Sequence, residues 1–595
     1  MLSAHHFHIP VMGLGFTVDS PIKVAKYGIS SVVSIMDDQL LEDMRRRYSR
    51  ELTIPYIAIN DEEEDARAKR IEAYLNFLHY IIQRQMRNLR GQDFMLDKDI
   101  NRYFELLPMD HPAAKLYQNM KHAAGFKKLN LQEELRKFLV SGRTDVNIMT
   151  KVDKINYKKS GEALDREYSD ALSALRGFAK SKLEGGVVFS AGMNPSLYSY
   201  VEQFEDFFPD QNGAIGKPVI LKVSDYRSAL IQGKFLAKKG IWVSEFRIES
   251  GLNCGGHAFA TDGLLAGPIL EAFKENRKEL RETLFQICQE ALEGKGAAKL
   301  PEGIQPKITY QGGIGNAEEN RFLMDYYQLD GTGWGSPFLL VPEATSVDKD
   351  TLQRLLKAKK SDFYLSYASP LGIPFNNLRN SSAEEQRKSR IEKGRPGSPC
   401  YKKFLSFNTE FTEKPICTAS RQYQNLKIKQ HANGEINEKE MHAVLDKDCL
   451  CEGLSAPAIL SGGEVPRRNL KAVTICPGPN LAYFKGIFSL KEMVDHIYGK
   501  FNLRLDPERP HVFIKELQLY MQHLKSEIDS KVLETNKKQQ VFLEKFRKNL
   551  FEGIEYYQNL TENFSLDTIS AMEKIKAQLN GLKKELQHLE PILVN

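Results

Sequence analysis

Eight short apolar segments, most of them separated by helical patterns, constrain the fold of this chain more than any other feature. A buried strand, a helix and a second buried strand in succession are typical of a parallel sheet with right-handed crossovers. Eight such units in one run favour a closed barrel over an open sheet, so we predict an α/β fold, a (β/α)₈ TIM barrel. The expected strands cover residues 8–16, 30–36, 146–150, 186–191, 218–223, 243–249, 307–311 and 335–341.

The remaining sequence divides into three further regions, because 595 residues are too many for one compact core. The barrel is expected to use residues 1–50 and 145–375, with a helical insertion at 51–144. Residues 376–485 read as an irregular region that contains most of the cysteines, and residues 486–595 as a helical C-terminal region. Apolar residues between Met572 and Leu589 recur at spacings of three and four. This spacing predicts a helix packed on the barrel or in a small bundle.

Composition narrows the class of protein. Hydrophobic residues make up 42% and charged residues 27% of the chain, which is typical of a soluble globular protein. The net charge of +6 is small beside 83 basic and 77 acidic residues, so we expect no nucleic-acid partner. The sequence contains no apolar run of membrane-spanning length and no signal-peptide pattern at its start. Its odd number of cysteines, seven, fits a reducing compartment. We therefore expect a cytoplasmic protein that acts on a small molecule, with the C-terminal helices available for an oligomer or partner contact.

Three glycine-rich turns accompany three of the expected strands. The first is Met12-Gly13-Leu14-Gly15, the second spans residues 312–315 (GGIG) and the third spans residues 331–336 (GTGWGS). Barrels commonly bind phosphate with the loops around strands 7 and 8, through backbone N–H groups and a helix N-terminus. Glycine lets the backbone approach an anion closely because it has no Cβ. The second and third turns together therefore predict a phosphate site.

A histidine follows the expected sixth strand. Residues 249–257 read ESGLNCGGH, so that His257 comes directly after a Gly-Gly turn at the C-terminal end of a barrel strand. An imidazole at a barrel mouth can serve as a general base or form a hydrogen bond to a bound group. The alternative is a structural loop histidine.

These motifs occur in an order that resembles one enzyme family. PVMGLGF followed by SPIKVAKYG, then DVNIM at 145–149, GGH at 255–257, GGIG and GTGWGSPF resemble nitronate monooxygenases (2-nitropropane dioxygenase-like enzymes) and related FMN-dependent enoyl reductases. The resemblance covers residues 8–50 and 145–345. It departs from the family at Leu252-Asn253-Cys254, before the Gly-Gly-His turn, and at Trp334.

The resemblance implies a cofactor and a set of site residues. The cofactor is FMN, with His257 as the catalytic base or substrate-orienting residue at the barrel mouth. The implied FMN-binding residues are Met12, Gly13, Asn147, Lys222, Gly312, Gly313, Gly315, Gly333, Trp334, Gly335 and Ser336. The implied activity is that of an FMN-dependent oxidoreductase resembling nitronate monooxygenase.

Other functions stay open at this point. An NAD(P)H-dependent FMN reductase of enoyl or acyl substrates fits the same motifs. A flavin-free barrel lyase or isomerase could use the phosphate loops for its substrate and Lys222 with Glu249 for its chemistry. A non-catalytic subunit could use the helical additions to bind a partner.

Five of the seven cysteines, Cys400, Cys417, Cys449, Cys451 and Cys476, fall within one Gly- and Pro-containing region. Thiolates in such a region can hold zinc or an iron–sulfur cluster. The single residue between Cys449 and Cys451 is a poor spacing for one tetrahedral zinc ion, which prefers two to four. Both a metal site and unlinked reduced cysteines therefore remain as interpretations.

Overall fold

The structure is a computed structural model of the chain. It describes residues 3–158, 160–190, 192–254, 262–467, 471–503, 505–530, 537–563 and 569–589.

The predicted barrel is confirmed. Eight parallel strands pair in chain order and close, since the first strand is hydrogen-bonded to both the second and the eighth. The strands are β1 (Phe7–Ile9), β2 (Ser30–Ser34), β3 (Thr144–Ile148), β4 (Val187–Phe189), β5 (Val219–Val223), β6 (Val243–Glu249), β7 (Lys307–Gln311) and β8 (Gly331–Gly333).

The eighth strand lies earlier in the sequence than predicted. Residues 335–341 were expected to form it, but Ser336–Leu340 is a 3₁₀ helix, η5, with Pro337 near its start. Proline has no N–H to donate to a strand ladder, and it suits the first turn of a helix. Gly331–Gly333 pairs with β7 and β1 instead. Residues 334–336 therefore follow β8 and lie at the C-terminal face of the barrel, where barrel enzymes bind their ligands.

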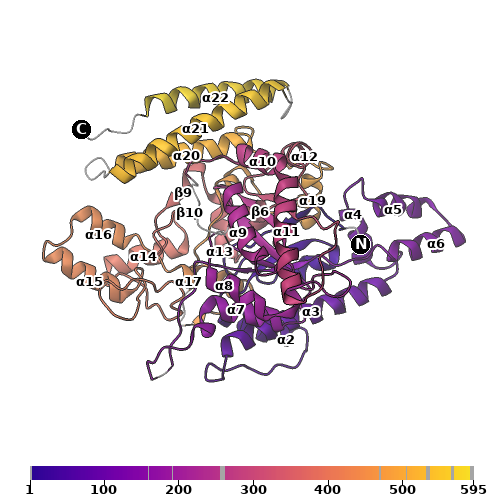
Figure 1. Cartoon of the computed structure of the whole chain (residues 1–595), viewed down its shortest axis with the longest axis horizontal. Helices are drawn as coiled ribbons and strands as arrows, with labels where there is room; N and C mark the ends of the chain where they lie inside the picture. Colours follow the sequence, from indigo (N-terminus) through magenta and orange to yellow (C-terminus); the bar gives the residue numbers. More distant parts are fainter. Residues whose placement is uncertain are drawn as a thin grey trace.

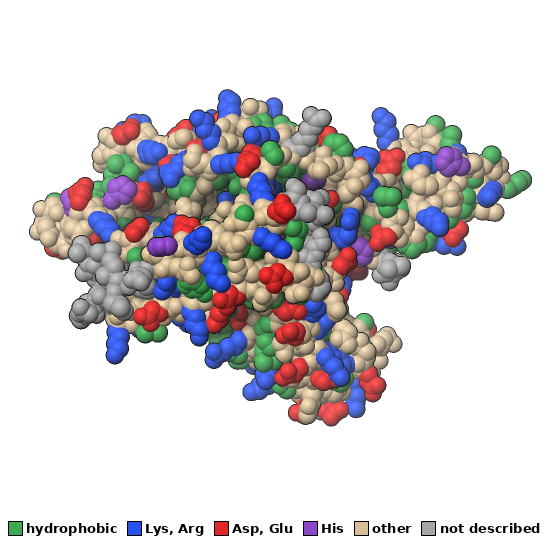
Figure 2. All heavy atoms as spheres, turned by 90° about the horizontal axis from the view of Figure 1, so that it is seen from above, with side chains coloured by type: hydrophobic (Ala, Val, Ile, Leu, Met, Phe, Trp, Pro, Cys, Tyr) green, Lys and Arg blue, Asp and Glu red, His purple; other side chains and the backbone are tan. Residues whose placement is uncertain are grey.

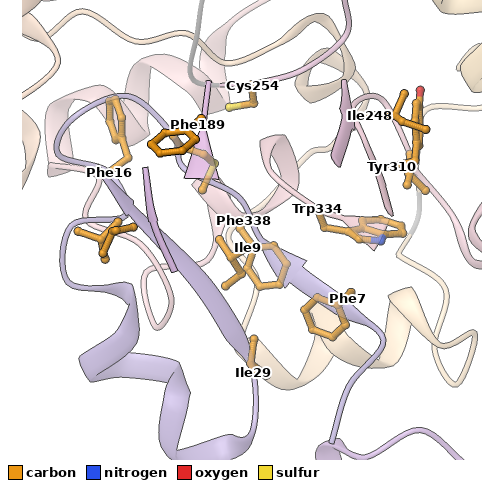
Figure 3. Close-up of a cluster of buried hydrophobic side chains, with 14 of the residues drawn as sticks. Phe7, Ile9, Phe16, Ile29, Phe189, Ile248, Cys254, Tyr310, Trp334 and Phe338 are labelled. Carbon is orange, nitrogen blue, oxygen red and sulfur yellow. The ribbon is translucent and has the colours of Figure 1, made fainter. Parts of the chain in front are cut away.

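Large apolar side chains fill the space around β1, β7 and β8 (Figure 3). Trp334 and Tyr310 are among the largest fully buried residues, and they lie in the same cluster as Phe7, Ile9 and Phe338. Phe7 and Ile9 alternate with His8 along β1, and Tyr310 precedes Gln311 on β7, so this apolar cluster packs outside the barrel, whereas His8 and Gln311 are hydrogen-bonded to each other (3.3 Å) inside it. Barrel enzymes bind their ligands above the C-terminal ends of the strands.

Helices surround the barrel and fill the insertion. The outer ring includes α2 (Asp38–Glu51), α7 (Asp170–Lys180), α9 (Tyr226–Ala237), α11 (Arg277–Lys295) and α12 (Ala317–Tyr326). The insertion between β2 and β3 contributes α3 (Ala66–Gly91), α4 (Lys98–Leu106), α5 (Pro112–His122) and α6 (Gly125–Arg136). Helix α3 packs on α2 and α7, whereas α5 and α6 project from the body of the molecule (Figure 1).

The residues after the barrel form a cap at its C-terminal mouth. The cap contains a two-stranded sheet of β9 (Phe363–Ser366) and β10 (Phe375–Leu378), and the helices α14 (Ser382–Glu392), α15 (Arg421–Ala432), α16 (Glu438–Leu445), α17 (Leu450–Gly453) and α18 (Ala456–Ser461). The backbone N–H of Gly15, in the loop after β1, donates to the carbonyl of Leu454 (2.9 Å). The Lys402 ammonium pairs with the buried Asp37 carboxylate after β2 (2.5 Å). These contacts join the cap to the strand ends.

Three helices form a bundle at the C-terminal end of the chain: α20 (Val512–Ser530), α21 (Lys537–Asn563) and α22 (Ile569–His588). Leu579 and Leu586 of α22 are fully buried, and all three helices pack on one another, which confirms the predicted bundle. Helices α20 and α21 also contact α10 (Ala266–Glu275), beside the barrel (Figure 1). Positive and negative side chains are intermingled over the face shown in Figure 2. No helix among the described residues is long and apolar enough to cross a membrane.

A buried acid joins this bundle to the barrel and predicts a pH-dependent stability. The Glu516 carboxyl of α20 is 1% exposed and accepts the Ala266 N–H (2.8 Å) at the start of α10. Burial raises the pKa of Glu516 from 4.5 to about 8. The folded state therefore favours the neutral form of Glu516. The stabilisation that this carboxyl gives the folded state is complete below its unfolded-state pKa, and it is lost as the pH rises through about 8.

We expect Glu516→Gln, which keeps the acceptor oxygen, to remove this part of the pH dependence. Between about pH 5 and about pH 7, the free energy of unfolding of the wild type should fall by roughly 2–3 kcal/mol relative to that of the variant. Urea unfolding of the full chain at both pH values measures this. Glu544→Gln on α21, where the side chain is exposed, is the matched control. Equal pH profiles for the two variants would contradict the prediction.

Candidate functional site

A cavity lies at the C-terminal mouth of the barrel, with about 1090 Å³ of space when its opening to solvent is included. We call it the mouth cavity. Its walls come from the ends of β1 to β6 and from three segments of the cap. It is lined by Val11, Gly13, Leu14, Ser34, Met36, Asn147, Met149, Thr150, Lys151, Val152, Ser190, Lys222, Glu249, Asn253, Leu371, Ile373, Phe375, Phe404, Leu405, Leu450, Cys451 and Leu454.

An ion pair forms one polar side of the mouth cavity. The Lys222 ammonium of β5 is 2.8 Å from the Glu249 carboxylate of β6, and both side chains are nearly buried. The Gln311 amide donates to the same carboxylate oxygen (2.8 Å), as does the Asn253 amide. Because several donors hold Glu249, it keeps the Lys222 cation fixed at the cavity wall. A fixed cation there can stabilise negative charge on a bound group.

Two further polar groups face the cavity from neighbouring strands. The side-chain amide oxygen Oδ1 of Asn147, near the end of β3, accepts from the Ser190 hydroxyl after β4 (3.1 Å). Most of the remaining wall is apolar, as with Met36, Phe375 and Leu454. A mostly apolar cavity with a few convergent polar groups is typical of a site for a small organic ligand or cofactor.

Three of the predicted flavin-binding residues meet at this cavity. Gly13, Asn147 and Lys222 all line it. Gly13 has a φ of +62°, which favours glycine, and a Cβ there would lie 3.3 Å from side-chain atoms of Leu454 and Phe16, which would have to move slightly to make room for it. Met12, in contrast, is fully buried beneath the wall and does not line the cavity.

The turns after β7 and β8 offer two free backbone donors. Within the part of the chain that the structure describes, the N–H groups of Gly313 and Gly335 have no hydrogen-bond partner, and both residues are half-buried. Asn253 lies between these turns and the mouth cavity. It lines the cavity, and a Cβ added to Gly312 would lie only 3.1 Å from its backbone nitrogen. Free N–H groups on glycines are suited to binding an anion.

The helix N-terminus after β7, where the sequence predicts phosphate binding, holds the protein's own carboxylate. Glu319 accepts the N–H of Gly315 (2.8 Å) and forms a two-pronged ion pair with Arg509 (2.8 and 2.7 Å). A Cβ on Gly315 would lie 2.1 Å from the Arg509 guanidinium carbon. Gly315 is therefore a packing glycine, because the chain itself supplies both the anion and the cation at this helix end.

The other predicted cofactor residues in these turns pack against neighbouring side chains, and their contact with a flavin stays a prediction. Gly333 is a strand residue against Gln311 and His8, where a Cβ would lie 2.6 Å from the Gln311 side chain. Trp334 is 1% exposed, with its indole N–H toward the Thr332 hydroxyl (3.3 Å). Gly312 packs on Ser250, and Ser336 is buried beside Gly478. Of the predicted phosphate residues, only Gly313 and Gly335 offer a donor that is both free and partly exposed.

The predicted catalytic base, His257, and the two glycines before it lie outside the described residues.

Sequence reasoning missed several residues of the site. The cap residues Phe404, Leu405 and Leu454 belong to a region with no regular periodicity, and no local signal places them over the barrel. Gln311 could have been found, because it is the last residue of β7 and so lies at the same mouth as Lys222. Ser190, next to the end of β4, could have been found in the same way.

Four of the five clustered cysteines, Cys400, Cys417, Cys449 and Cys451, lie near enough to shift one another's pKa, whereas Cys476 lies beside Cys254. The Cys476 carbonyl accepts from the thiol of Cys254 after β6 (3.0 Å), whereas Cys451 lines the mouth cavity. Cys400 and Cys417 line a second hollow, within the cap. None of the seven cysteines forms a disulfide. Among the described residues, no group of three or more His, Cys, Asp or Glu side chains is placed to hold a metal ion, so the structure lends the predicted zinc or iron–sulfur site no support.

No protein-family model and no curated protein sequence matches the chain. Solved structures that match it include the enoyl reductase domain of MlnA from the macrolactin biosynthesis cluster of Bacillus amyloliquefaciens, with 16% identity and a TM-score of 0.31 over 68% of this chain and 86% of that one. They also include nitroalkane oxidase from Streptomyces ansochromogenes, with 10% identity and a TM-score of 0.32 over 83% of this chain and 94% of that one. At these values the fold assignment rests on the closed eight-stranded barrel itself.

Proposed function

We propose that the chain is an FMN-dependent oxidoreductase that resembles nitronate monooxygenases, with its active site in the mouth cavity. The observation that carries this proposal is the meeting of Gly13, Asn147 and Lys222 on the wall of one mostly apolar cavity at the C-terminal ends of the strands. Sequence resemblance alone assigns these three residues to the flavin. Their convergence supports the assignment, since barrel enzymes carry their active sites at this face.

The residues present fit FMN in two places. The mouth cavity, with its apolar walls and the Asn147 and Lys222 side chains, suits a flat ring system with a polar edge. The free N–H groups of Gly313 and Gly335, reached past Asn253, suit the phosphate. When bound, FMN would supply the redox chemistry.

The chain's own side chains have distinct roles in this proposal. Lys222 holds a positive charge at the cavity wall, and Glu249 fixes its position. The cap residues Phe404 and Leu405 cover the cavity and exclude water from it. His257 is the proposed base that takes a proton from the substrate.

A second candidate is favoured by the same ion pair. A cation and a carboxylate 2.8 Å apart in a barrel mouth can polarise a carbonyl and move a proton without a flavin, as in a lyase or isomerase. The visible spectrum of the purified full-length protein separates the two candidates, because only the flavoprotein is yellow.

We expect heat treatment of the purified protein to release FMN and no FAD. If the protein is isolated without flavin, it should bind added FMN, and Asn147→Leu should weaken that binding about tenfold, as expected for one lost hydrogen bond. Asn130→Leu, on the exposed surface of α6, is the matched control. Fluorescence quenching of FMN measures both. Release of FAD, or failure of the wild type to bind FMN, would refute the proposal.

A further inference from the structure

The cap brings two cysteines from separate segments, Cys400 and Cys417, close together. Ser398 forms a parallel bridge with Ser420, and Asn408 forms an antiparallel bridge with Ile416. The backbone N–H of Ser398 also donates to the carbonyl of Ala419 (2.9 Å). These bonds place residues 398–408 beside residues 416–420, so that Cys400 and Cys417 line one hollow and the Cys417 thiol is near enough to shift the pKa of the Cys400 thiol.

The pair opens to its own cavity. A hollow with about 870 Å³ of empty space is lined by both cysteines and by Ser406, Lys403, Lys414 and Arg421. We call it the thiol cavity. Cys400 is half-buried, whereas Cys417 is 4% exposed. A reagent that enters the thiol cavity therefore meets Cys400 first, beside cationic side chains that favour a thiolate.

We propose that Cys400 and Cys417 form a redox-active dithiol that reduces hydroperoxides, with Cys400 as the attacking thiol and Cys417 as the resolving thiol. The Cys400 thiolate attacks the peroxide oxygen, the O–O bond breaks, and the leaving oxygen takes a proton and departs as water or an alcohol. Cys400 is then a sulfenic acid. The Cys417 sulfur attacks the sulfenic sulfur, a second water leaves, and an intramolecular disulfide remains.

The pKa shifts of the cysteine thiols support Cys400 as the attacking thiol. The neighbouring Cys417 thiol and the Ser406 hydroxyl lower the pKa of the Cys400 thiol below its ordinary value, which favours its thiolate. Burial raises the pKa of Cys288 and of Cys449 to about 12. Cys400 also has a φ of +45°, a conformation that non-glycine residues rarely adopt and that is concentrated at functional sites.

The disulfide would act on the mouth cavity through the chain that it closes. Phe404 and Leu405, which line the mouth cavity, lie between the two cysteines in sequence. Lys402, in the same loop, is the residue paired with Asp37 after β2. A disulfide requires its two sulfurs to approach to about 2.05 Å, closer than a hydrogen bond, so its formation must move this loop. The redox state of the pair would therefore alter ligand binding in the mouth cavity.

The test uses the full-length, fully reduced protein and hydrogen peroxide in stoichiometric steps. We expect the first two thiols to disappear together, the intact mass to fall by two hydrogen atoms, and peptide mapping without reductant to join Cys400 to Cys417. In Cys417→Ser, Cys400 should instead be trapped by dimedone as a sulfenic acid. In Cys400→Ser, Cys417 should remain reduced at the same dose. Cys288→Ser should behave as the wild type, since Cys288 is fully buried in α11.

Three outcomes would overturn the proposal: all seven thiols remaining free at a dose that oxidises exposed methionines, a disulfide between any other pair, or near-stoichiometric zinc or iron whose removal is needed before either thiol reacts. The thiol measurements need no flavin, so they succeed or fail independently of the proposed function. The coupling to the mouth cavity is tested separately, by a change in FMN affinity between the reduced and the oxidised protein that is absent in Cys400→Ser.

Discussion

Replacing Arg509 with methionine is expected to destabilise the full-length protein by about 3–5 kcal/mol, the usual effect of removing one partner from a buried ion pair. Arg509 and Glu319 are 7% and 1% exposed, and their two parallel hydrogen bonds join α12 to the segment before α20. Methionine fills much of the same volume but leaves the Glu319 carboxylate buried without a cation. The free energy of unfolding in urea at neutral pH measures the effect.

The double variant Arg509→Met/Glu319→Gln separates the unpaired charge from the lost packing. It should recover much of the stability, because the neutral amide no longer needs a counterion. Arg84→Met, on the exposed surface of α3, is the control for arginine loss and should change stability by less than about 0.5 kcal/mol. If Arg509→Met loses as little stability as Arg84→Met, the ion pair between Arg509 and Glu319 does not stabilise this end of α12.

The same pair makes a prediction about acid. Burial alone would raise the pKa of Glu319, but Arg509 and the backbone N–H of Gly315 hold it below its ordinary value. A carboxyl with a lowered pKa stabilises the folded state above its unfolded-state pKa, and this contribution is lost as the pH falls through the folded-state pKa. The wild type should therefore lose stability more steeply in acid than the double variant.

The barrel could be predicted from the sequence because its strands are short apolar runs between helical patterns, a rhythm that few folds share. The eighth strand could not be placed. Gly331–Gly333 has almost no side chains to show a strand pattern, whereas the apolar run after Ser336 looks like a strand and forms a 3₁₀ helix. A strand specified by its two neighbours in a closed barrel needs little intrinsic strand preference of its own.

The site was predictable only where it is built from strand ends. Asn147 and Lys222 each lie on a strand, and the strands of a barrel converge at one face, so their meeting followed from the fold. Arg509 contacts Glu319, which lies 190 positions away in the sequence, and no periodic pattern predicts this contact. Glycine motifs were ambiguous for the same reason: Gly313 and Gly315 look alike in sequence, but one has a free N–H and the other packs against Arg509.

Removing the cation from the mouth cavity should have the largest effect on activity. In Lys222→Met we expect turnover of a small alkyl nitronate to fall about 10²–10³-fold, the usual loss when one preorganised electrostatic donor is removed from an active site. Lys222 is positioned by Glu249, and Glu249 in turn by Gln311, so the charge needs no reorganisation when a ligand enters. Steady-state kinetics with FMN-saturated protein measures the loss. Lys180→Met, exposed at the end of α7, is the matched control.

The double variant Lys222→Met/Glu249→Gln shows whether the loss reflects the missing cation or the carboxylate left without it. If the cation is what activity needs, the double variant should stay as slow as Lys222→Met, although its stability should recover because no unpaired charge remains at the cavity wall. If turnover returns together with stability, Lys222 serves the fold and not the reaction. Turnover of Lys222→Met within about threefold of the wild type, with its melting temperature unchanged, would place the active site outside the mouth cavity.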